Sequence, residues 1–359
     1  MNGPTSGIAY PRPLRPGDTI AVTASSAPVR PEHEGRLDFV IGWLRDRGYR
    51  VVEGECLRGE SVVSAPAQDR ADEFNAFVRD PSVRAVVPPW GGETAIDIVD
   101  LLDADALAAD PTWVVGWSDI STLLLPLTLR SGVATLHGQN LMDTPYDLPR
   151  GTAHWLDVVA RERGEEFVQQ DPGVRRRGGW DDWSRLPAVT RVDLSEPASW
   201  RYDGGSLDVT GRLIGGCLDV VCHLAGSPFG DVPRFAERCP EGTIVYLENC
   251  EAPALDAARM LHGLRLAGWF DGARAVLLGR TGAKTSGDFT QDDAVEDALG
   301  QLDVPVVRDV DFGHVPPGNV LVNGALARVT MDGPRHEIRQ SFVRPRPPVE
   351  GVGSFASSR

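Results

Sequence analysis

Ser118 is the residue whose setting most strongly suggests covalent chemistry. It lies in Val114-Val115-Gly116-Trp117-Ser118-Asp119-Ile120, where an apolar run typical of a buried strand meets the expected start of a helix. A sharp turn at such a junction can push a hydroxyl into a cleft, as in the G-x-S-x-G elbow. Gly116 fits that pattern, whereas Ile120 replaces its second glycine. The segment predicts a nucleophilic serine, with a plain helix cap by Ser118 or Asp119 as the alternative.

A serine nucleophile needs a base, and the base needs a carboxylate that orients it. His314 lies in Asp311-Phe312-Gly313-His314-Val315-Pro316-Pro317, a proline-stiffened loop that follows an apolar run. Glu248 ends the apolar run 244–247, which places it at the carboxyl edge of a strand, where parallel sheets bind ligands. We therefore predict a triad of Ser118, Glu248 and His314.

Both partners of the serine have structural alternatives. His314 could be an ordinary hydrogen-bonded loop residue, and Glu248 could pair with Arg259. The apolar neighbours of the two competing histidines favour neutral, hydrogen-bonded core residues. The competing residues are His137, His223 and, as a second carboxylate, Glu251.

Two glycines in Pro88-Pro89-Trp90-Gly91-Gly92-Glu93 follow another apolar run. Glycine has no side chain, so backbone N–H groups can approach a ligand closely. The Gly92 N–H and the Asp119 N–H, at the start of the next helix, are the expected oxyanion hole. Gly91 is expected to line the substrate site. The alternative is an ordinary strand-to-helix turn.

The elements that must position these residues alternate between short apolar runs and amphipathic stretches. Such alternation predicts a parallel sheet with crossover helices. The expected N-terminal strands are 19–23, 51–52, 84–87 and 113–115, and the expected helices are 37–47, 71–78, 94–102 and 119–130, the last closed by Gly132. The expected C-terminal strands are 244–247, 275–278 and 304–307, with helices at 255–266 and 292–299.

The segment 148–198 separates the two regions and is rich in Arg, Asp, Trp and Pro with weak periodicity. We interpret it as a long connection with an aromatic loop. A chain of 359 residues exceeds the usual size of one domain, so two α/β domains that meet at a cleft are expected.

Composition excludes several classes of function. The net charge of -15 disfavours nucleic acid as a partner, and we find no segment that is apolar enough to cross a membrane. The N-terminal stretch lacks the pattern of a secretory signal, so a cytoplasmic location is expected. The five cysteines lack paired spacing, which predicts neither a metal site nor disulfides. No dinucleotide or P-loop signature is present, so no cofactor is expected.

Six short motifs together resemble the LD-carboxypeptidase family of serine peptidases, in order and approximate spacing over nearly the whole chain. They are Leu14-Arg15-Pro16-Gly17-Asp18, Gly91-Gly92, Gly116-Trp117-Ser118-Asp119, Gly215-Gly216-Cys217-Leu218, Leu247-Glu248 and Asp311-Phe312-Gly313-His314. Gly92-Glu93-Thr94 and the Trp-containing insertion make the chain look closer to the microcin C immunity branch than to the muropeptide branch. Trp117 stands where the family often has Tyr.

The resemblance implies the same Ser118–Glu248–His314 triad, the oxyanion donors at Gly92 and Asp119, and a homodimer. It also implies a flavodoxin-like N-terminal domain at 1–165 that carries the nucleophile and a connection at 166–205. A smaller C-terminal α/β domain at 206–345 would carry Glu248 and His314, with the active site at the interface. Residues 346–359 are expected to form a flexible tail.

The resemblance implies a small-molecule or short-peptide substrate of one of two kinds. One is a muropeptide that loses a terminal D-amino acid, and the other is an aminoacyl- or peptidyl-nucleotide amide. Trp180 and Trp183 could stack on a purine, or they could simply pin the connection to the protein. The rival from another class is a non-catalytic two-domain protein that binds a small ligand in its cleft.

Overall fold

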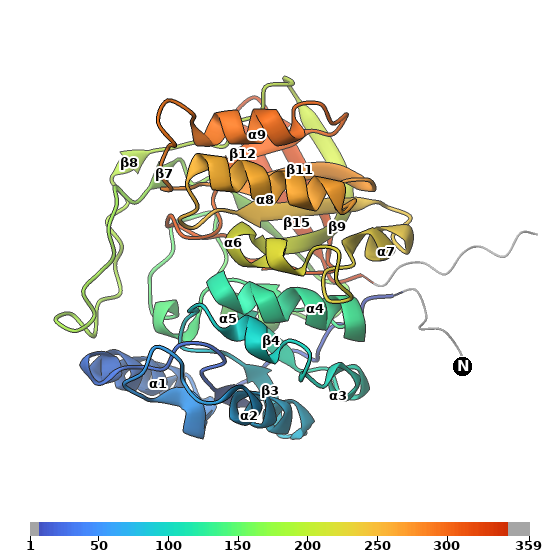
Figure 1. The fold of residues 1–359 in the computed structure, drawn as a ribbon. Coiled ribbons are helices and arrows are strands. Elements are labelled where there is room, and N and C mark those ends of the chain that lie inside the picture. Colours follow the sequence, from blue (N-terminus) through green and yellow to red (C-terminus); the bar gives the residue numbers. More distant parts are fainter. Residues whose placement is uncertain (1–6, 344–359) are drawn as a thin grey trace, which may run out of the picture.

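The computed structural model describes residues 7–343 and contains two stacked α/β units (Figure 1). A six-stranded sheet organises the N-terminal unit, which is the lower one in Figure 1, and a seven-stranded sheet organises the C-terminal unit. The expected α/β class with two units is confirmed. The expected flexible tail at 346–359 lies outside the described residues.

The first sheet has the flavodoxin-like strand order. Its parallel strands run β2-β1-β3-β4-β5, and the antiparallel β13 is added beside β5. The bounds are β1 Thr19–Val22, β2 Arg50–Glu53, β3 Val83–Val86, β4 Trp113–Gly116, β5 Leu136–His137 and β13 Leu321–Val322. In this order the carboxyl end of β4 lies in the interior of the sheet, where ligands bind in such folds.

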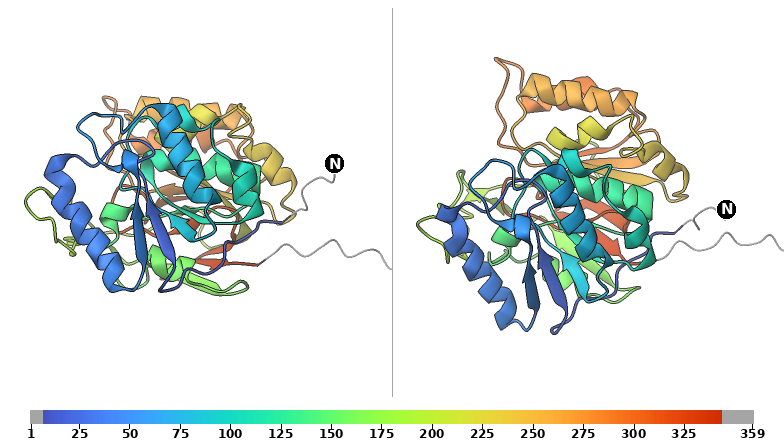
Figure 2. Two further views of the ribbon diagram at one scale, coloured as in Figure 1. Left: turned by 90° about the horizontal axis from the view of Figure 1, so that it is seen from below. Right: turned by 60° about the horizontal axis from the view of Figure 1, so that its bottom comes forward.

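Helices cover both faces of this sheet (Figure 2), because neighbouring residues of each strand point to opposite sides. The side chains of Ile20 and Val22 pack into the hydrophobic core on one face of the sheet, and the side chain of Ala21 packs into the core on the other face. Each core is covered by its own group of helices. The first group is α1 Glu34–Asp46 and α5 Trp155–Val159, and the second is α2 Ala67–Arg79, α3 Ala104–Ala109 and α4 Ser121–Ser131. Gly132 ends α4 in a left-handed conformation, as expected.

The second sheet has the order β12-β11-β10-β9-β14-β15-β6. Its first four strands are parallel, and the last three are antiparallel. The bounds are β6 Glu166–Gln170, β9 Leu207–Cys217, β10 Thr243–Glu248, β11 Ala273–Gly279, β12 Val306–Val310, β14 Leu326–Asp332 and β15 Arg335–Ser341. The helices of this unit are α6 Leu218–Val221, α7 Val232–Glu237, α8 Ala254–Leu266 and α9 Gln291–Leu299.

Two contacts join the units next to the predicted site. β13 belongs to the C-terminal part of the chain, yet it pairs with β5 of the first sheet. The Ser121 Oγ at the start of α4 accepts a hydrogen bond of 3.0 Å from the Cys217 N–H at the end of β9. A Cβ on Gly216 would lie 2.7 Å from the Ser121 side chain, so only glycine allows this approach.

The expected helix at 94–102 is wrong. Only a short 3-10 helix, Ala95–Ile98, forms there. The buried Arg70 guanidinium donates hydrogen bonds to the Thr94 carbonyl oxygen at 2.8 Å and to the Asp97 carboxylate at 2.9 Å. The Thr94 carbonyl is therefore used by Arg70, and helical propensity is overridden by tertiary contacts.

The connection at 148–198 contains more structure than the sequence predicted. α5 and β6 lie within it, and β6 becomes the edge strand of the second sheet beside β15. The strands β9, β14 and β15 were also absent from the sequence prediction. The Asp332-Gly333 pair at the β14–β15 turn is a hairpin signal that could have revealed two of them.

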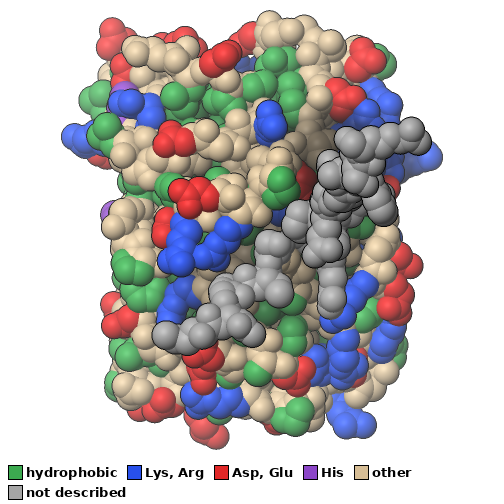
Figure 3. Space-filling view, turned by 90° about the vertical axis from the view of Figure 1, so that its right-hand side faces the viewer, with side chains coloured by type: hydrophobic (Ala, Val, Ile, Leu, Met, Phe, Trp, Pro, Cys, Tyr) green, Lys and Arg blue, Asp and Glu red, His purple; other side chains and the backbone are tan. Residues whose placement is uncertain are grey.

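The surface is mixed in charge. On the face shown in Figure 3, Lys and Arg side chains are interspersed with Asp and Glu over the upper and lower parts of the molecule. Within residues 7–343, no helix has both the length and the apolar character that a membrane crossing requires.

Candidate active site

Ser118 lies at the turn that joins β4 to the 3-10 helix Ser118–Ile120, directly before α4. Its φ of 61° is in the left-handed region, which a non-glycine residue rarely occupies. A Cβ on Gly116 would lie 2.8 Å from both the Asn140 amide and the Ile120 side chain, so glycine is needed for this tight turn. Strain of this kind holds the hydroxyl out of the helix and toward the cleft.

The structure brings Ser118, His314 and Glu248 into one hydrogen-bonded chain. The His314 Nε2 lies 3.0 Å from the Ser118 Oγ, and the His314 Nδ1 lies 2.8 Å from a Glu248 carboxylate oxygen. Glu248 ends β10 and is 1% exposed, and His314 lies on the loop after β12. A proton could pass from the hydroxyl to the imidazole, and the carboxylate would balance the resulting charge.

Burial and charge act in opposite directions on this pair. Burial by itself lowers the pKa of His314, but the Glu248 carboxylate and Cys250 together outweigh it and raise that pKa well above the usual value. Burial raises the pKa of Glu248, yet the charge and hydrogen bond of His314 bring it below its usual value. The pair therefore favours an ionised carboxylate beside a strongly basic imidazole.

The Gly91-Gly92 turn lies against the serine. A Cβ on Gly91 would be 2.9 Å from the Ser118 Oγ and 3.0 Å from the Asp119 N, so the absence of a side chain leaves space there. Within residues 7–343, neither the Gly92 N–H nor the Asp119 N–H donates to a protein acceptor. Two free donors beside an open space are what an oxyanion hole requires.

The Asp119 side chain anchors this turn. Its carboxylate is buried and accepts hydrogen bonds from Ser26 Oγ at 2.6 Å and from the Ala95 N–H at 2.9 Å. Ser26 Oγ in turn accepts from the Thr94 N–H at 3.0 Å. The loop that carries the glycines is therefore bound to the residue that follows the serine, which fixes both amide groups relative to the hydroxyl.

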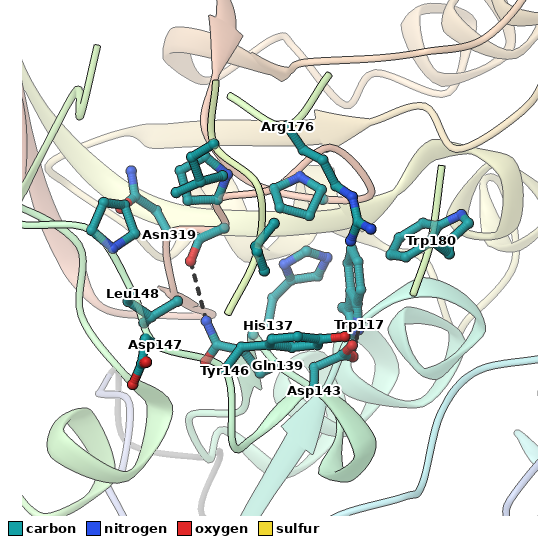
Figure 4. A pocket seen from close by; sticks show the side chains of 18 residues that line it. Trp117, His137, Gln139, Asp143, Tyr146, Asp147, Leu148, Arg176, Trp180 and Asn319 are labelled. Carbon is teal, nitrogen blue, oxygen red and sulfur yellow. Dashed lines mark hydrogen bonds between the residues drawn. The ribbon is translucent and has the colours of Figure 1, made fainter. Parts of the chain in front are cut away.

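A cavity lies next to the triad (Figure 4), and its wall includes Trp117 and Gly313, the residues that precede Ser118 and His314. Its wall combines aromatic rings, charged groups and amides. Labelled wall residues include Trp117, Tyr146, Trp180, Arg176, Asp143 and Asn319. Such a mixture of apolar surface and a few polar groups is typical of small-molecule sites.

Trp117 forms the side of the cavity nearest the catalytic histidine candidate. Its ring lies 4.5 Å from the His314 ring at 32°, and its Nε1 donates to Asp143 at 3.2 Å. Burial raises the pKa of Asp143 to about 6, and the bond from Trp117 opposes that rise. The sequence drew attention to Trp117 only as a departure from the family.

The two tryptophans that the sequence singled out lie in different places. Trp180 is 57% exposed, lines the cavity and lies 6.4 Å from the His314 ring. Trp183 does not line it; its Nε1 donates to the Tyr146 hydroxyl at 2.8 Å, and its ring stacks on Trp90 at 6.4 Å. These contacts attach the connecting segment to the N-terminal unit, which is the structural alternative that the sequence analysis gave for Trp183.

The competing residues lie elsewhere or make other contacts. Arg259 pairs with Asp256, so it does not neutralise Glu248. Glu251 is exposed, and its N–H donates to Asp219 at 3.2 Å. His137, in contrast, is buried only 4.0 Å from Glu248. The sequence signalled none of Asn319, Arg176, Tyr146 and Asp143, because isolated polar residues in loops carry no pattern.

One group of side chains among the described residues could hold a metal ion. Ligand atoms of Cys217, Glu248 and His314 lie within 4.8 Å of one another. Two of these residues are joined by the 2.8 Å hydrogen bond, and Cys217 is 2% exposed. Because His314 and Glu248 already bond to each other, the arrangement is also suited to proton transfer without a metal ion.

Comparisons with known proteins identify the family of this chain. Sequence models of the LD-carboxypeptidase N-terminal and C-terminal domains match residues 20–138 and 210–329. A predicted carboxypeptidase of Streptomyces coelicolor is 30% identical over 334 residues, which cover 90% of this chain and 94% of the relative. This chain belongs to the LD-carboxypeptidase family. Its similarity to carboxypeptidases supports a peptidase function.

Other members of the LD-carboxypeptidase family extend the comparison. The microcin C7 self-immunity protein MccF of Escherichia coli is 24% identical over 347 residues, covering 92% of this chain and 96% of MccF. The structure of MccF with aspartyl sulfamoyl adenosine has a TM-score of 0.78 at 22% identity, covering 93% and 99% of the two chains. A muramoyltetrapeptide carboxypeptidase from Oxalobacter formigenes has a TM-score of 0.68 at 22% identity, covering 90% and 98%. These structures share the fold.

Proposed function

We propose that the protein is a serine hydrolase that cleaves an amide bond through an acyl-enzyme. Ser118 is the nucleophile, His314 the base and Glu248 the residue that orients it. The observation that carries this proposal is the continuous chain of hydrogen bonds, 3.0 Å from serine to histidine and 2.8 Å from histidine to glutamate. The distances meet the requirement for proton transfer in such triads.

The reaction proceeds in two steps. His314 takes the Ser118 hydroxyl proton as Oγ attacks the amide carbon, and the N–H groups of Gly92 and Asp119 stabilise the oxyanion. His314 then gives its proton to the leaving nitrogen as the C–N bond breaks. In the second step water loses a proton to His314 and attacks the acyl carbon; the bond from that carbon to Ser118 Oγ then breaks as His314 returns the proton to Oγ, which releases the carboxylic acid and restores the serine.

The wall of the cavity indicates what kind of leaving group could bind there. Because His314 must protonate the leaving amine, the leaving group lies next to His314. The wall includes Gly313, Pro316 and Pro317 of the loop that carries His314. Its aromatic rings and few polar groups suit a leaving group with a flat ring better than a single alanine.

We therefore favour an aminoacyl- or peptidyl-nucleotide amide as the substrate. The exposed Trp180 ring at the wall of the cavity offers a stacking surface for a flat base. The solved structure of MccF in complex with aspartyl sulfamoyl adenosine contains a ligand of related chemistry. Removal of a terminal D-amino acid from a muropeptide is the second candidate, which the Oxalobacter relative supports.

The first test compares two substrates with wild-type protein and with Ser118→Ala. An aspartyl-nucleotide amide and a tetrapeptide that ends in D-alanine are incubated separately, and the products are followed by mass spectrometry. We expect cleavage of the nucleotide amide by wild-type protein alone. Release of D-alanine alone would establish the muropeptide activity, and cleavage of neither would favour a ligand-binding protein.

A further inference from the structure

His137 is a buried histidine whose ring nitrogens lack partners. It ends β5, and its Cα is paired with that of Gly116 in the neighbouring β4. The residue is 1% exposed, and neither Nδ1 nor Nε2 has a hydrogen-bond partner within residues 7–343. The sequence predicted a neutral core histidine with satisfied hydrogen bonds; its burial and neutral state are confirmed, whereas the expected partners are missing. Buried polar groups without partners are rare because each costs free energy.

The second unpartnered atom is an oxygen of Glu248. One carboxylate oxygen, Oε2, accepts from His314, whereas the buried Oε1 has no partner within hydrogen-bonding distance in the described chain; the nearby Cys217 thiol is a weak donor that lowers the pKa of Glu248. The His137 Nε2 lies 4.0 Å from that Oε1. A side-chain movement of about 1 Å would bring this pair to hydrogen-bonding distance. Two buried groups that each need a partner thus face one another.

Two aromatic rings pack against the His137 ring. The Tyr246 ring lies 5.5 Å away at 67°, and the Phe312 ring lies 6.3 Å away at 86°. Burial lowers the pKa of His137 to about 4, so the ring is neutral at neutral pH and carries a single N–H. A neutral donor can satisfy Glu248 without competing with the charge of His314.

We propose that His137 is a positioning residue whose Nε2–H donates to Glu248 Oε1, so that Oε2 faces His314. The catalytic consequence of this bond rests on the function proposed above. The bond draws negative charge away from Oε2, and it therefore limits how far Glu248 raises the proton affinity of His314.

Other titratable groups around this pair remain the same in the variants below. Burial raises the pKa of the Cys217 thiol, the Cys250 thiol and the Tyr246 hydroxyl, so all three are neutral near pH 7. Asp143, with a pKa of about 6, also interacts with His314. A change in the pH profile on replacing His137 can therefore be assigned to the contact with Glu248.

The test compares His137→Leu with His137→Gln, because the Gln Nε2 can replace the histidine donor. We expect His137→Leu to lower kcat/KM by about ten- to a hundred-fold and to move the acid limb of its pH profile to higher pH. His137→Gln should return the limb toward its wild-type position. His154→Leu removes a half-buried histidine whose ring bonds to Thr144 and Leu156 rather than to the triad, and it should leave the limb in place. An unmoved limb in His137→Leu, or a shifted limb in His137→Gln, would overturn the proposal.

A second measurement does not depend on activity or on the folding of a variant. In wild-type protein labelled with ¹⁵N-histidine, NMR distinguishes the two neutral tautomers. We expect a neutral His137 with its proton on Nε2. A proton on Nδ1, or a charged ring at pH 7, would overturn the proposal even if the substrate tests succeed. Conversely, an Nε2–H tautomer in a protein that cleaves neither substrate would refute only the proposed function.

Discussion

At the scale of single residues, Ser118 combines a reactive position with a strained backbone. Its left-handed φ of 61° costs a non-glycine residue about 1 to 3 kcal/mol. That cost is tolerated because Gly116 and the turn before α4 leave no other path for the chain. The hydroxyl is in consequence held 3.0 Å from His314, although the residue destabilises its own turn.

This strain predicts that two substitutions at position 118 lower activity equally but differ in their effect on stability. Ser118→Ala and Ser118→Gly should both lose activity by several orders of magnitude, since each removes the nucleophile. Ser118→Gly should be more stable than Ser118→Ala by about 1 kcal/mol, because only glycine adopts this φ freely. Urea denaturation measures the difference. Equal stabilities would show that the turn is not strained.

The pKa of His314 predicts the pH dependence. Only neutral His314 can act as a base, so kcat/KM is lost as the pH falls through this pKa. Because Glu248 raises it, the acid limb should lie above the ordinary histidine value of about 6.5. In Glu248→Gln the carboxylate charge is absent, while burial still lowers the pKa of His314 and Cys250 still raises it, so the limb should move to lower pH while the maximal rate falls. A limb that Glu248→Gln leaves in place would contradict the assigned role.

At the scale of elements, two loops at the carboxyl edge of the first sheet approach so closely that one of them must carry glycine. The loop after β3 brings Gly91 to the serine, and the loop after β4 presents the Asp119 N–H. Gly91 does not need a left-handed φ, so space alone requires glycine there. Element ends that meet at one edge thus build the oxyanion site from backbone groups.

Gly91→Ala tests this requirement for space. The added methyl would lie 2.9 Å from the Ser118 Oγ, so kcat/KM should fall by about a hundred-fold or more while the fold is kept. Gly263→Ala is the matched control, because that glycine of α8 has no other group within 4 Å of a new Cβ. It should keep full activity. A Gly91→Ala variant with unchanged kinetics would place the oxyanion donors elsewhere.

At the scale of the whole molecule, the segment between the two sheets closes the cavity. Arg36 of α1 reaches this segment, where its guanidinium donates to the carbonyl oxygens of Pro187 and Val189 at 3.0 Å and 2.6 Å. It also lies 5.2 Å from the Trp183 ring. The N-terminal unit therefore anchors one end of the aromatic loop, and Trp180 is presented to the cavity from the other.

The two tryptophans should respond differently to substitution. Trp180→Ala should raise KM for the nucleotide amide with little change in stability, because the ring is 57% exposed. Trp183→Ala removes contacts with Tyr146, Trp90 and Arg36, so it should lower the free energy of unfolding by about 1 to 2 kcal/mol. Kinetics and thermal unfolding of both variants provide the comparison. Identical effects on KM would reject the separate roles.

Local patterns in the sequence predicted most of the N-terminal sheet. The apolar runs around Ile20, Val86 and Val114 became β1, β3 and β4, because burial on both faces leaves a continuous apolar signature. β14 and β15 were missed, since their exposed residues alternate with short buried stretches, and β9 was missed because glycines interrupt its buried half. The helix expected at 94–102 was lost to the contacts of Arg70, which local propensity does not record.

The sequence by itself determined which residues were candidates. Ser118, Glu248 and His314 each stand at the end of an apolar run, and their catalytic role stays a prediction. Only the tertiary structure decided that they meet, because 196 residues separate Ser118 from His314 and 66 separate His314 from Glu248. Their distances depend on how β13 joins the first sheet and how α4 packs on β9. The unpartnered nitrogens of His137 likewise became visible only when burial and distance could be measured, since no sequence pattern encodes what a buried side chain faces.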